Sequence, residues 1–106
     1  MDDKEHAADP GYEIQKAFTI STAHITAEDN KFLEEAGTDD SNCHVVVYSF
    51  AFGYYIWIDP GMKITDYKGL SMAFQKLIKI AKQLECEYLK LDRDGHVYDN
   101  LETFDW

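Results

Sequence analysis

The stretch 43–59, CHVVVYSFAFGYYIWID, constrains the fold more than any other part of the chain. β-branched and aromatic residues dominate it, which favours β-structure, and it is longer than a typical strand. We expect two strands, at about 44–50 and 54–59, joined by a tight turn near 51–53. A single straight strand is the alternative, because no Asn-Gly or Asp-Gly pair marks a turn. That strand would carry a face of small residues, at 49, 51 and 53, over which a helix packs closely.

Four further elements surround this stretch. Residues 14–20 and 88–91 are predicted strands. Thr26 is suited to cap a helix that ends at Gly37, and Thr65 is suited to cap a second helix over 66–84. The second helix has an apolar stripe at three- and four-residue spacing, formed by Leu70, Ala73, Phe74, Leu77, Ile80, Ala81 and Leu84.

The order β-α-β-β-α-β predicts an α+β protein of the ferredoxin-like plan, with a four-stranded antiparallel sheet and two helices on one face. Residues 97–106 form a C-terminal extension whose Leu101, Phe104 and Trp106 are expected to pack against the domain. Residues 1–13 are polar and acidic and are predicted to be a flexible tail. The single domain is therefore expected at 14–106, since 106 residues suit one core.

The chain is expected to reside in the cytoplasm. Its first residues lack the basic and apolar regions of a signal peptide, and no apolar run approaches the length of a membrane span. Cys43 and Cys86 are its two cysteines and form no CxxC pair, so we expect free thiols.

Acidic residues outnumber basic ones by 20 to 10, for a formal net charge of −10. Such a surface repels nucleic acid and anionic membranes and attracts basic partners. The charge has two interpretations: it keeps the protein soluble, or it imitates a phosphate backbone. Residues 63–84 are the exception, with five basic residues and one acidic residue. They form either a solvated lysine face or a surface for self-association.

Two groups of residues are candidates for catalysis. Asp92, Asp94 and His96 alternate after the last strand and are suited to hold a divalent metal, although Asp-Arg-Asp-Gly is also ordinary turn chemistry. Ser21 and His24 bring a hydroxyl and an imidazole together, but nothing local orients the imidazole. Side-chain hydrogen bonds to the loop backbone are the alternative role for Thr22 and His24. No glycine-rich phosphate loop and no zinc spacing occurs, so no cofactor is predicted.

The aromatic residues exceed what one face of a small sheet can bury. Some are therefore expected at the surface, where Tyr and Trp are typical of protein interfaces. In the alternative, the C-terminal extension covers them. They are Tyr48, Phe50, Phe52, Tyr54, Tyr55, Trp57, Tyr88, Tyr98, Phe104 and Trp106.

Three motifs carry a family resemblance: ISTAHIT at 20–26, LDRDG at 91–95 and LETFDW at 101–106. Together they resemble a family of small uncharacterised proteins carried on bacterial plasmids, prophages and phages, over most of residues 18–106. The resemblance implies a mobile element as the source. Small acidic proteins of such elements are often counter-defence factors of the anti-restriction or anti-CRISPR type. The resemblance assigns no catalytic residue.

The leading hypothesis is a non-enzymatic inhibitor that blocks the basic nucleic-acid-binding surface of a host protein and does not itself bind nucleic acid or membrane. One alternative is a small metal-dependent hydrolase or nuclease using Asp92, Asp94 and His96. Another is a structural or regulatory homodimer that pairs the basic helix with an acidic surface. The residues expected to contact the partner are Glu28, Asp29, Glu34, Glu35, Asp39, Asp40, Asp92, Asp94, Asp99, Glu102 and Asp105.

Overall fold

The computed structural model describes residues 11–37, 45–67 and 69–106. The first ten residues of the predicted tail, Asp39, Asp40, Cys43 and the start of the predicted strand at 44 therefore lie outside the described residues. Within the described ranges, no helix is long and apolar enough to cross a membrane.

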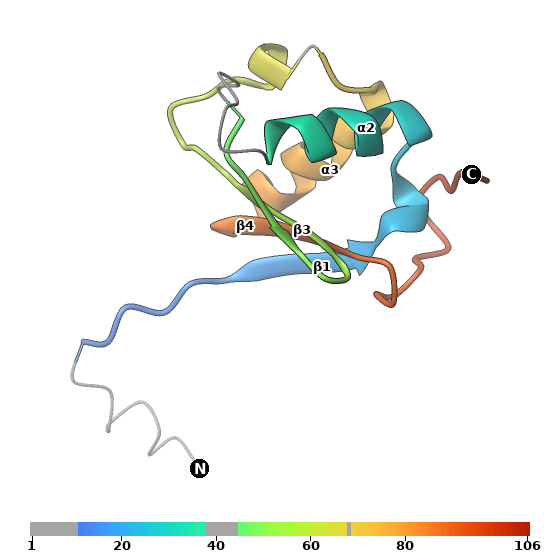
Figure 1. Ribbon diagram of the computed structural model, residues 1–106. Coiled ribbons are helices and arrows are strands. Elements are labelled where there is room, and N and C mark those ends of the chain that lie inside the picture. Colours follow the sequence, from blue (N-terminus) through green and yellow to red (C-terminus); the bar gives the residue numbers. More distant parts are fainter. Residues whose placement is uncertain (1–10, 38–44, 68) are drawn as a thin grey trace.

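The described chain forms one mixed sheet with both helices on the same side of it (Figure 1). The strands are β1 (Ala17–Ser21), β2 (Val47–Phe50), β3 (Gly53–Trp57) and β4 (Tyr88–Asp92). The helices are α2 (Ala27–Ala36) and α3 (Met72–Gln83), and two short 3-10 helices, η1 (Thr22–His24) and η2 (Ile64–Tyr67), precede them. The α+β class and the order of strands and helices are as predicted.

The pairing of the strands differs from the ferredoxin-like plan. The order across the sheet is β1-β4-β3-β2, and β1 runs parallel to β4 while the other neighbours are antiparallel. The expected all-antiparallel sheet is therefore wrong. The physical reason is that strand-forming patterns act locally, whereas the choice of neighbour depends on contacts between residues more than sixty positions apart, such as Ile20 beside Leu91.

The two-strand interpretation of the long apolar stretch is confirmed. Phe50 pairs with Gly53, so Ala51 and Phe52 form the turn between β2 and β3. The straight-strand alternative, with a helix against its small residues, is wrong. Gly53 serves a different purpose, because a Cβ there would lie 1.8 Å from the Leu91 carbonyl oxygen. Only glycine permits β3 to approach β4 this closely at that position.

Both helices begin at a hydroxyl side chain. Thr26 caps α2 as predicted, since its Oγ1 accepts a hydrogen bond from Asp29 N at 3.0 Å. The cap predicted at Thr65 is wrong: α3 begins after Ser71, whose Oγ accepts from Phe74 N at 3.1 Å. The residues that follow Thr65 form η2 instead. Both threonine and serine suit a cap, so local chemistry alone left the start ambiguous.

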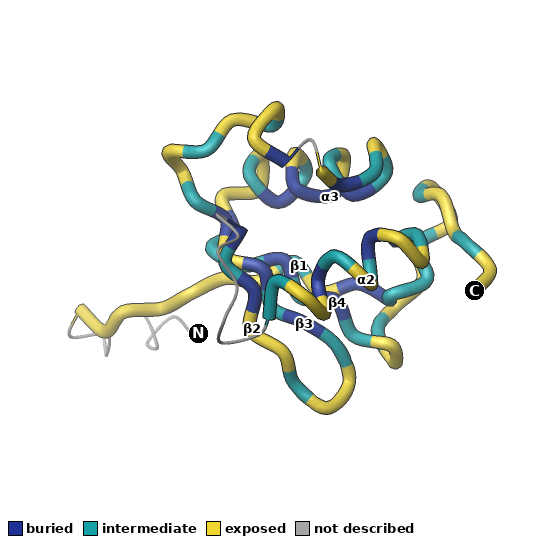
Figure 2. The backbone as a smooth tube through the Cα atoms, turned by 45° about the horizontal axis from the view of Figure 1, so that its top comes forward, coloured by how far each residue is buried: buried dark blue, intermediate teal, exposed yellow. Residues whose placement is uncertain are grey.

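The core lies between the sheet and the helices. Ile56 and Leu89 from the sheet, Leu33 from α2, and Phe74 and Leu77 from α3 are all buried there. Figure 2 shows buried segments on the sides of α3 and of the sheet that face one another. The opposite face of the sheet has neither helix against it, and this difference determines where exposed aromatic residues can gather.

The C-terminal extension packs against the domain, as predicted. Leu101 and Tyr98 lie against the core, and Phe104 N donates to Ala23 O at 2.8 Å. Trp106 Nε1 donates to Ile25 O at 2.8 Å. The last residues of the chain therefore lie beside η1 and the start of α2.

Candidate binding surfaces

Asp29 does not belong to a partner-binding surface, contrary to the prediction. Its side chain is 2% exposed. Oδ2 accepts hydrogen bonds from Thr26 N at 3.0 Å and Ser71 Oγ at 2.6 Å, and Oδ1 accepts from Ser71 N at 2.8 Å. Because these donors lie at the starts of α2 and α3, one carboxylate stabilises both helix N-termini. Asp29 is thus a structural residue.

The other predicted acidic residues that the structure describes are accessible. Glu28, Glu34 and Glu35 are exposed on α2. In the C-terminal part, Asp94, Asp99, Glu102 and Asp105 are exposed and Asp92 is half-buried. Asp39 and Asp40 lie outside the described residues.

Four hydrogen bonds hold the C-terminal extension beside η1 and α2. Two come from the backbone of Phe104 and the indole of Trp106, as described above. The other two involve the imidazole of His24: Nδ1 donates to Glu102 O at 2.7 Å, and Nε2 accepts from Tyr98 N at 2.9 Å. These bonds hold the extension, which carries Asp99, Glu102 and Asp105, beside the start of α2. We name the exposed carboxylates of α2 and of the extension the acidic surface: Glu28, Glu34, Glu35, Asp99, Glu102 and Asp105. Asp92 and Asp94 lie in the turn after β4 and are not part of it.

His24 therefore serves the fold and not catalysis. The imidazole is 1% exposed, and both ring nitrogens are engaged with backbone groups. A carbonyl oxygen only accepts and an amide N–H only donates, so the ring is in its neutral Nδ1–H form. Ser21 Oγ accepts from Ala23 N at 3.0 Å as the cap of η1. The backbone-binding interpretation of His24 is confirmed, and no nucleophile and base pair is present here.

The sequence Asp92-Arg93-Asp94-Gly95 forms a turn. Asp92 Oδ1 accepts from Asp94 N at 2.9 Å, and Asp92 O accepts from Gly95 N at 2.7 Å. His96 packs its ring against Tyr98, at 4.5 Å between centroids. In the part of the chain that is described, no three His, Cys, Asp or Glu side chains come together as metal ligands. The residues of the metal-dependent alternative therefore do not converge on one point.

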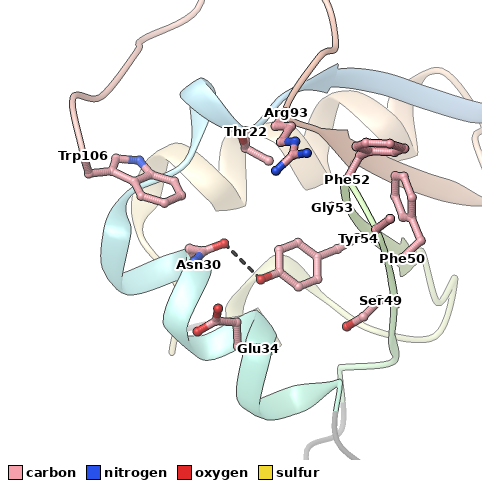
Figure 3. A pocket seen from close by; sticks show the side chains of 11 residues that line it. Thr22, Asn30, Glu34, Ser49, Phe50, Phe52, Gly53, Tyr54, Arg93 and Trp106 are labelled. Carbon is pink, nitrogen blue, oxygen red and sulfur yellow. Dashed lines mark hydrogen bonds between the residues drawn. The ribbon is translucent and has the colours of Figure 1, made fainter.

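A groove of about 600 Å³ lies between α2, the β2–β3 hairpin and the end of the chain. Figure 3 shows Asn30 of α2 pointing toward Tyr54, Glu34 further along the same helix, and Trp106 and Arg93 at the other margins of the groove. Tyr54 donates its hydroxyl to Asn30 Oδ1 at 3.0 Å. Burial, and then the nearby Glu34 carboxylate, raise the pKa of Tyr54 above its usual value. The groove thus combines one carboxylate, aromatic rings and neutral polar groups.

Arg93 lies at the opposite side of the groove from Glu34. Its guanidinium carbon is 5.1 Å from the centre of the Phe52 ring, which is a cation–π arrangement. Phe52 and Trp106 are 45% and 56% exposed, so the rings of the groove are accessible from solvent.

The helix-free face of the sheet carries a group of aromatic rings. Phe50 and Tyr55 lie 5.4 Å apart, and Tyr55 and Tyr88 lie 5.9 Å apart. Lys90 places its ammonium 5.6 Å from the Phe50 ring and 5.4 Å from the Tyr55 ring. Trp57 belongs to the same face through its pairing with Tyr88. The expectation that aromatic residues lie at the surface is thereby confirmed.

The C-terminal extension does not cover this aromatic face. Its Tyr98 ring packs instead against Phe18, at 6.0 Å, and against His24, at 6.2 Å. The alternative in which the extension buries the surplus aromatic residues is therefore wrong for Tyr48, which remains 55% exposed.

Residues 17–106 match a family model described as the C-terminal domain of a family of unknown function, DUF5983. The chain belongs to this family. No curated protein and no solved structure matches the chain. The family match covers the sheet, both helices and the C-terminal extension, so the groove and the acidic surface both lie within the shared domain.

Sequence reasoning found the exposed acidic residues but missed three features of the site. It did not anticipate the burial of Asp29, although the spacing Thr26-Ala27-Glu28-Asp29 resembles a capping box and offered a signal. It did not select Ser71 as the cap of α3. It also missed the groove, because Asn30 and Arg93 are more than sixty residues apart and only the tertiary structure brings both to its margin.

Proposed function

We propose that this protein is carried by a mobile genetic element and is a non-enzymatic inhibitor of the anti-restriction or anti-CRISPR type. It would block the nucleic-acid-binding surface of a host defence protein. The observation that supports the proposal is the joining of two acidic segments, distant in sequence, by hydrogen bonds to His24, Ala23 and Ile25.

The mechanism is competition with DNA or RNA. Nucleic-acid-binding proteins present Lys and Arg side chains to phosphates, and release of counterions drives much of their affinity. The carboxylates of the acidic surface would bind these Lys and Arg side chains in place of the phosphates. Two described lysines lie beside these carboxylates: Lys31 is exposed on α2, and Lys76 of α3 lines a small cavity with His24 and Glu102. Association should weaken as salt rises, because salt screens exposed charges.

The test is capture of a partner from bacterial lysates that contain restriction or CRISPR systems, with washes at stepped salt. The expected result is stoichiometric capture of a nucleic-acid-binding defence protein, lost at high salt and displaced by DNA. The double variant Glu28→Lys/Glu102→Lys should abolish capture. The matched control is Glu13→Lys/Glu85→Lys, which changes the net charge equally at exposed residues outside the acidic surface.

Two results would contradict the proposal. Capture that survives Glu28→Lys/Glu102→Lys in a folded protein would show that the acidic surface is not the contact. Equal loss in the control variant would show that only the total charge matters.

A regulatory homodimer is the second candidate function. It is favoured by the exposure of Lys76 and Lys79 on α3, which are suited to meet the acidic surface of a second copy. Lys82 is less available, because its ammonium donates to Met62 O. Sedimentation across salt concentrations tests this candidate: a dimer that dissociates as salt rises supports it, and a monomer at every salt concentration excludes it.

A further inference from the structure

We infer that the groove between α2 and the β2–β3 hairpin receives an arginine side chain of the partner. The inference rests on the proposed function, because it specifies which group of a basic partner the acidic surface recognises. It names a binding site whose recognising elements are the Glu34 carboxylate, the accessible ring of Trp106, and the polar pair of Asn30 and Tyr54.

The chemistry of the groove suits a guanidinium group. A guanidinium is planar, stacks on aromatic rings and forms paired hydrogen bonds to a carboxylate. Glu34 supplies the carboxylate on one wall of the groove (Figure 3). Phe52 already has the guanidinium of Arg93 at 5.1 Å from its ring centre, which demonstrates that a ring of this groove accepts such a group.

The position of Arg93 determines where a guest can bind. Arg93 lies at the Phe52 side of the groove, whereas Glu34 and Asn30 lie on α2, on the other side (Figure 3). A second cation is repelled by Arg93 and attracted by Glu34, so the guest occupies the α2 side, within reach of Trp106. The volume of this open groove, about 600 Å³, leaves room for a side chain.

A solution experiment tests the inference without the natural partner. The probe is N-acetyl-arginine methylamide, added to the folded 106-residue chain. The comparator is N-acetyl-citrulline methylamide, which has nearly the same shape but no charge. Proton–nitrogen NMR reports on the indole N–H of Trp106 and on the side-chain amide of Asn30. We expect saturable shifts at these two groups with the arginine probe and none with the citrulline probe.

Three variants should change the affinity for the arginine probe in three different ways. Glu34→Gln should weaken the arginine probe by about tenfold, because it removes the charged acceptor of the ion pair. Arg93→Gln should strengthen probe binding, because it removes a repelling cation and leaves the Arg93 backbone bond to Phe52 O intact. Glu85→Gln, an exposed residue outside the groove, should leave probe binding unchanged.

The inference is overturned if neither reporter group shifts, if the citrulline probe binds equally well, or if Glu34→Gln and Glu85→Gln have equal effects. The spectrum of each variant shows in the same experiment whether the fold is intact. Failure here is distinct from failure of the proposed function: salt-sensitive capture of a defence protein without arginine binding would leave the function standing and remove only this site.

Discussion

Helices α2 and α3 lie on the same face of the sheet but are held there in different ways. Four residues of α3 are buried, all of them apolar: Phe74, Leu77, Ile78 and Ala81. Only Asp29 and Leu33 are buried in α2, and Asp29 is held by hydrogen bonds. Apolar burial requires a wide stripe, whereas a few directed hydrogen bonds require one residue. Anchoring through Asp29 therefore leaves most of α2 free to carry exposed carboxylates.

The two modes of attachment are also coupled. Ser71 both caps α3 and donates its hydroxyl and backbone N–H to Asp29. The start of α3, which packing holds in place, is therefore the point to which α2 is attached. The position of the acidic surface thus depends on the core, although none of its carboxylates lies in the core.

The largest expected loss of stability comes from removing an apolar side chain of α3 from the core. Phe74→Ala should lower the free energy of unfolding by about 3–5 kcal/mol, because Phe74 is fully buried and its loss leaves a cavity. Urea unfolding followed by fluorescence measures the change. Met72→Ala on the same helix is the control, since Met72 is 84% exposed and should change stability by about 0.5 kcal/mol or less. A loss for Phe74→Ala as small as that of the control would contradict the account of α3.

The next largest expected loss of stability comes from the hydrogen bonds of Asp29, which attach α2. Asp29→Asn should lower the free energy of unfolding by about 2–3 kcal/mol, because an amide has one acceptor oxygen and leaves buried donors of Thr26 or Ser71 unsatisfied. The same unfolding measurement applies, with a double-mutant cycle to Ser71→Ala. We expect the two losses to overlap strongly. Additive losses would show that the shared hydrogen bonds do not link the two helices.

The smallest expected effect concerns a buried polar atom that lacks the partners Asp29 has. Among the described residues no group meets good hydrogen-bond geometry to the hydroxyl of Tyr67, in η2 before α3, although the Asp59 backbone lies near enough to act against the rise of its pKa. Tyr67→Phe should therefore change stability by about 1 kcal/mol or less, and in the stabilising direction. Tyr54→Phe is the matched control, because it removes the bond to Asn30 and should cost about 1 kcal/mol. The reverse ranking in thermal unfolding would contradict this account.

The burial of Tyr67 also predicts that the free energy of unfolding depends on pH. Burial, and then the carboxylates of Asp59 and Asp66, raise the pKa of Tyr67 above the ordinary value of 10.0. The folded state therefore resists ionisation more than the unfolded state does. The stability that the protonated Tyr67 contributes is fully present below pH 10, and it is lost as the pH rises from 10 through the folded-state pKa of Tyr67. Tyr67→Phe should reduce the loss of stability above pH 10, and an unchanged loss would argue against burial of an intact phenol.

Several elements of the fold followed from the sequence because their causes are local. The hairpin near 51–53, the Thr26 cap and the packing of the extension each depend on residues that are close in the chain or on the plain presence of Leu101 and Phe104. The start of α3 did not follow, since Thr65 and Ser71 offer equivalent capping hydroxyls. The acidic residues of the candidate surface were found by composition, but composition did not distinguish Asp29, which is buried, from Glu28, which is exposed.

The local sequence was enough to predict the α+β class, the order of the strands and helices and the excess of acidic residues, because period, propensity and charge act over short distances in the chain. The folded arrangement was needed to show that β1 lies parallel to β4, that Asp29 joins two helix starts and that His24 holds the extension beside α2. These outcomes depend on pairs of residues 42 to 78 positions apart. Such contacts stabilise the protein only when packing removes water from both partners at once. A local sequence pattern therefore does not indicate them.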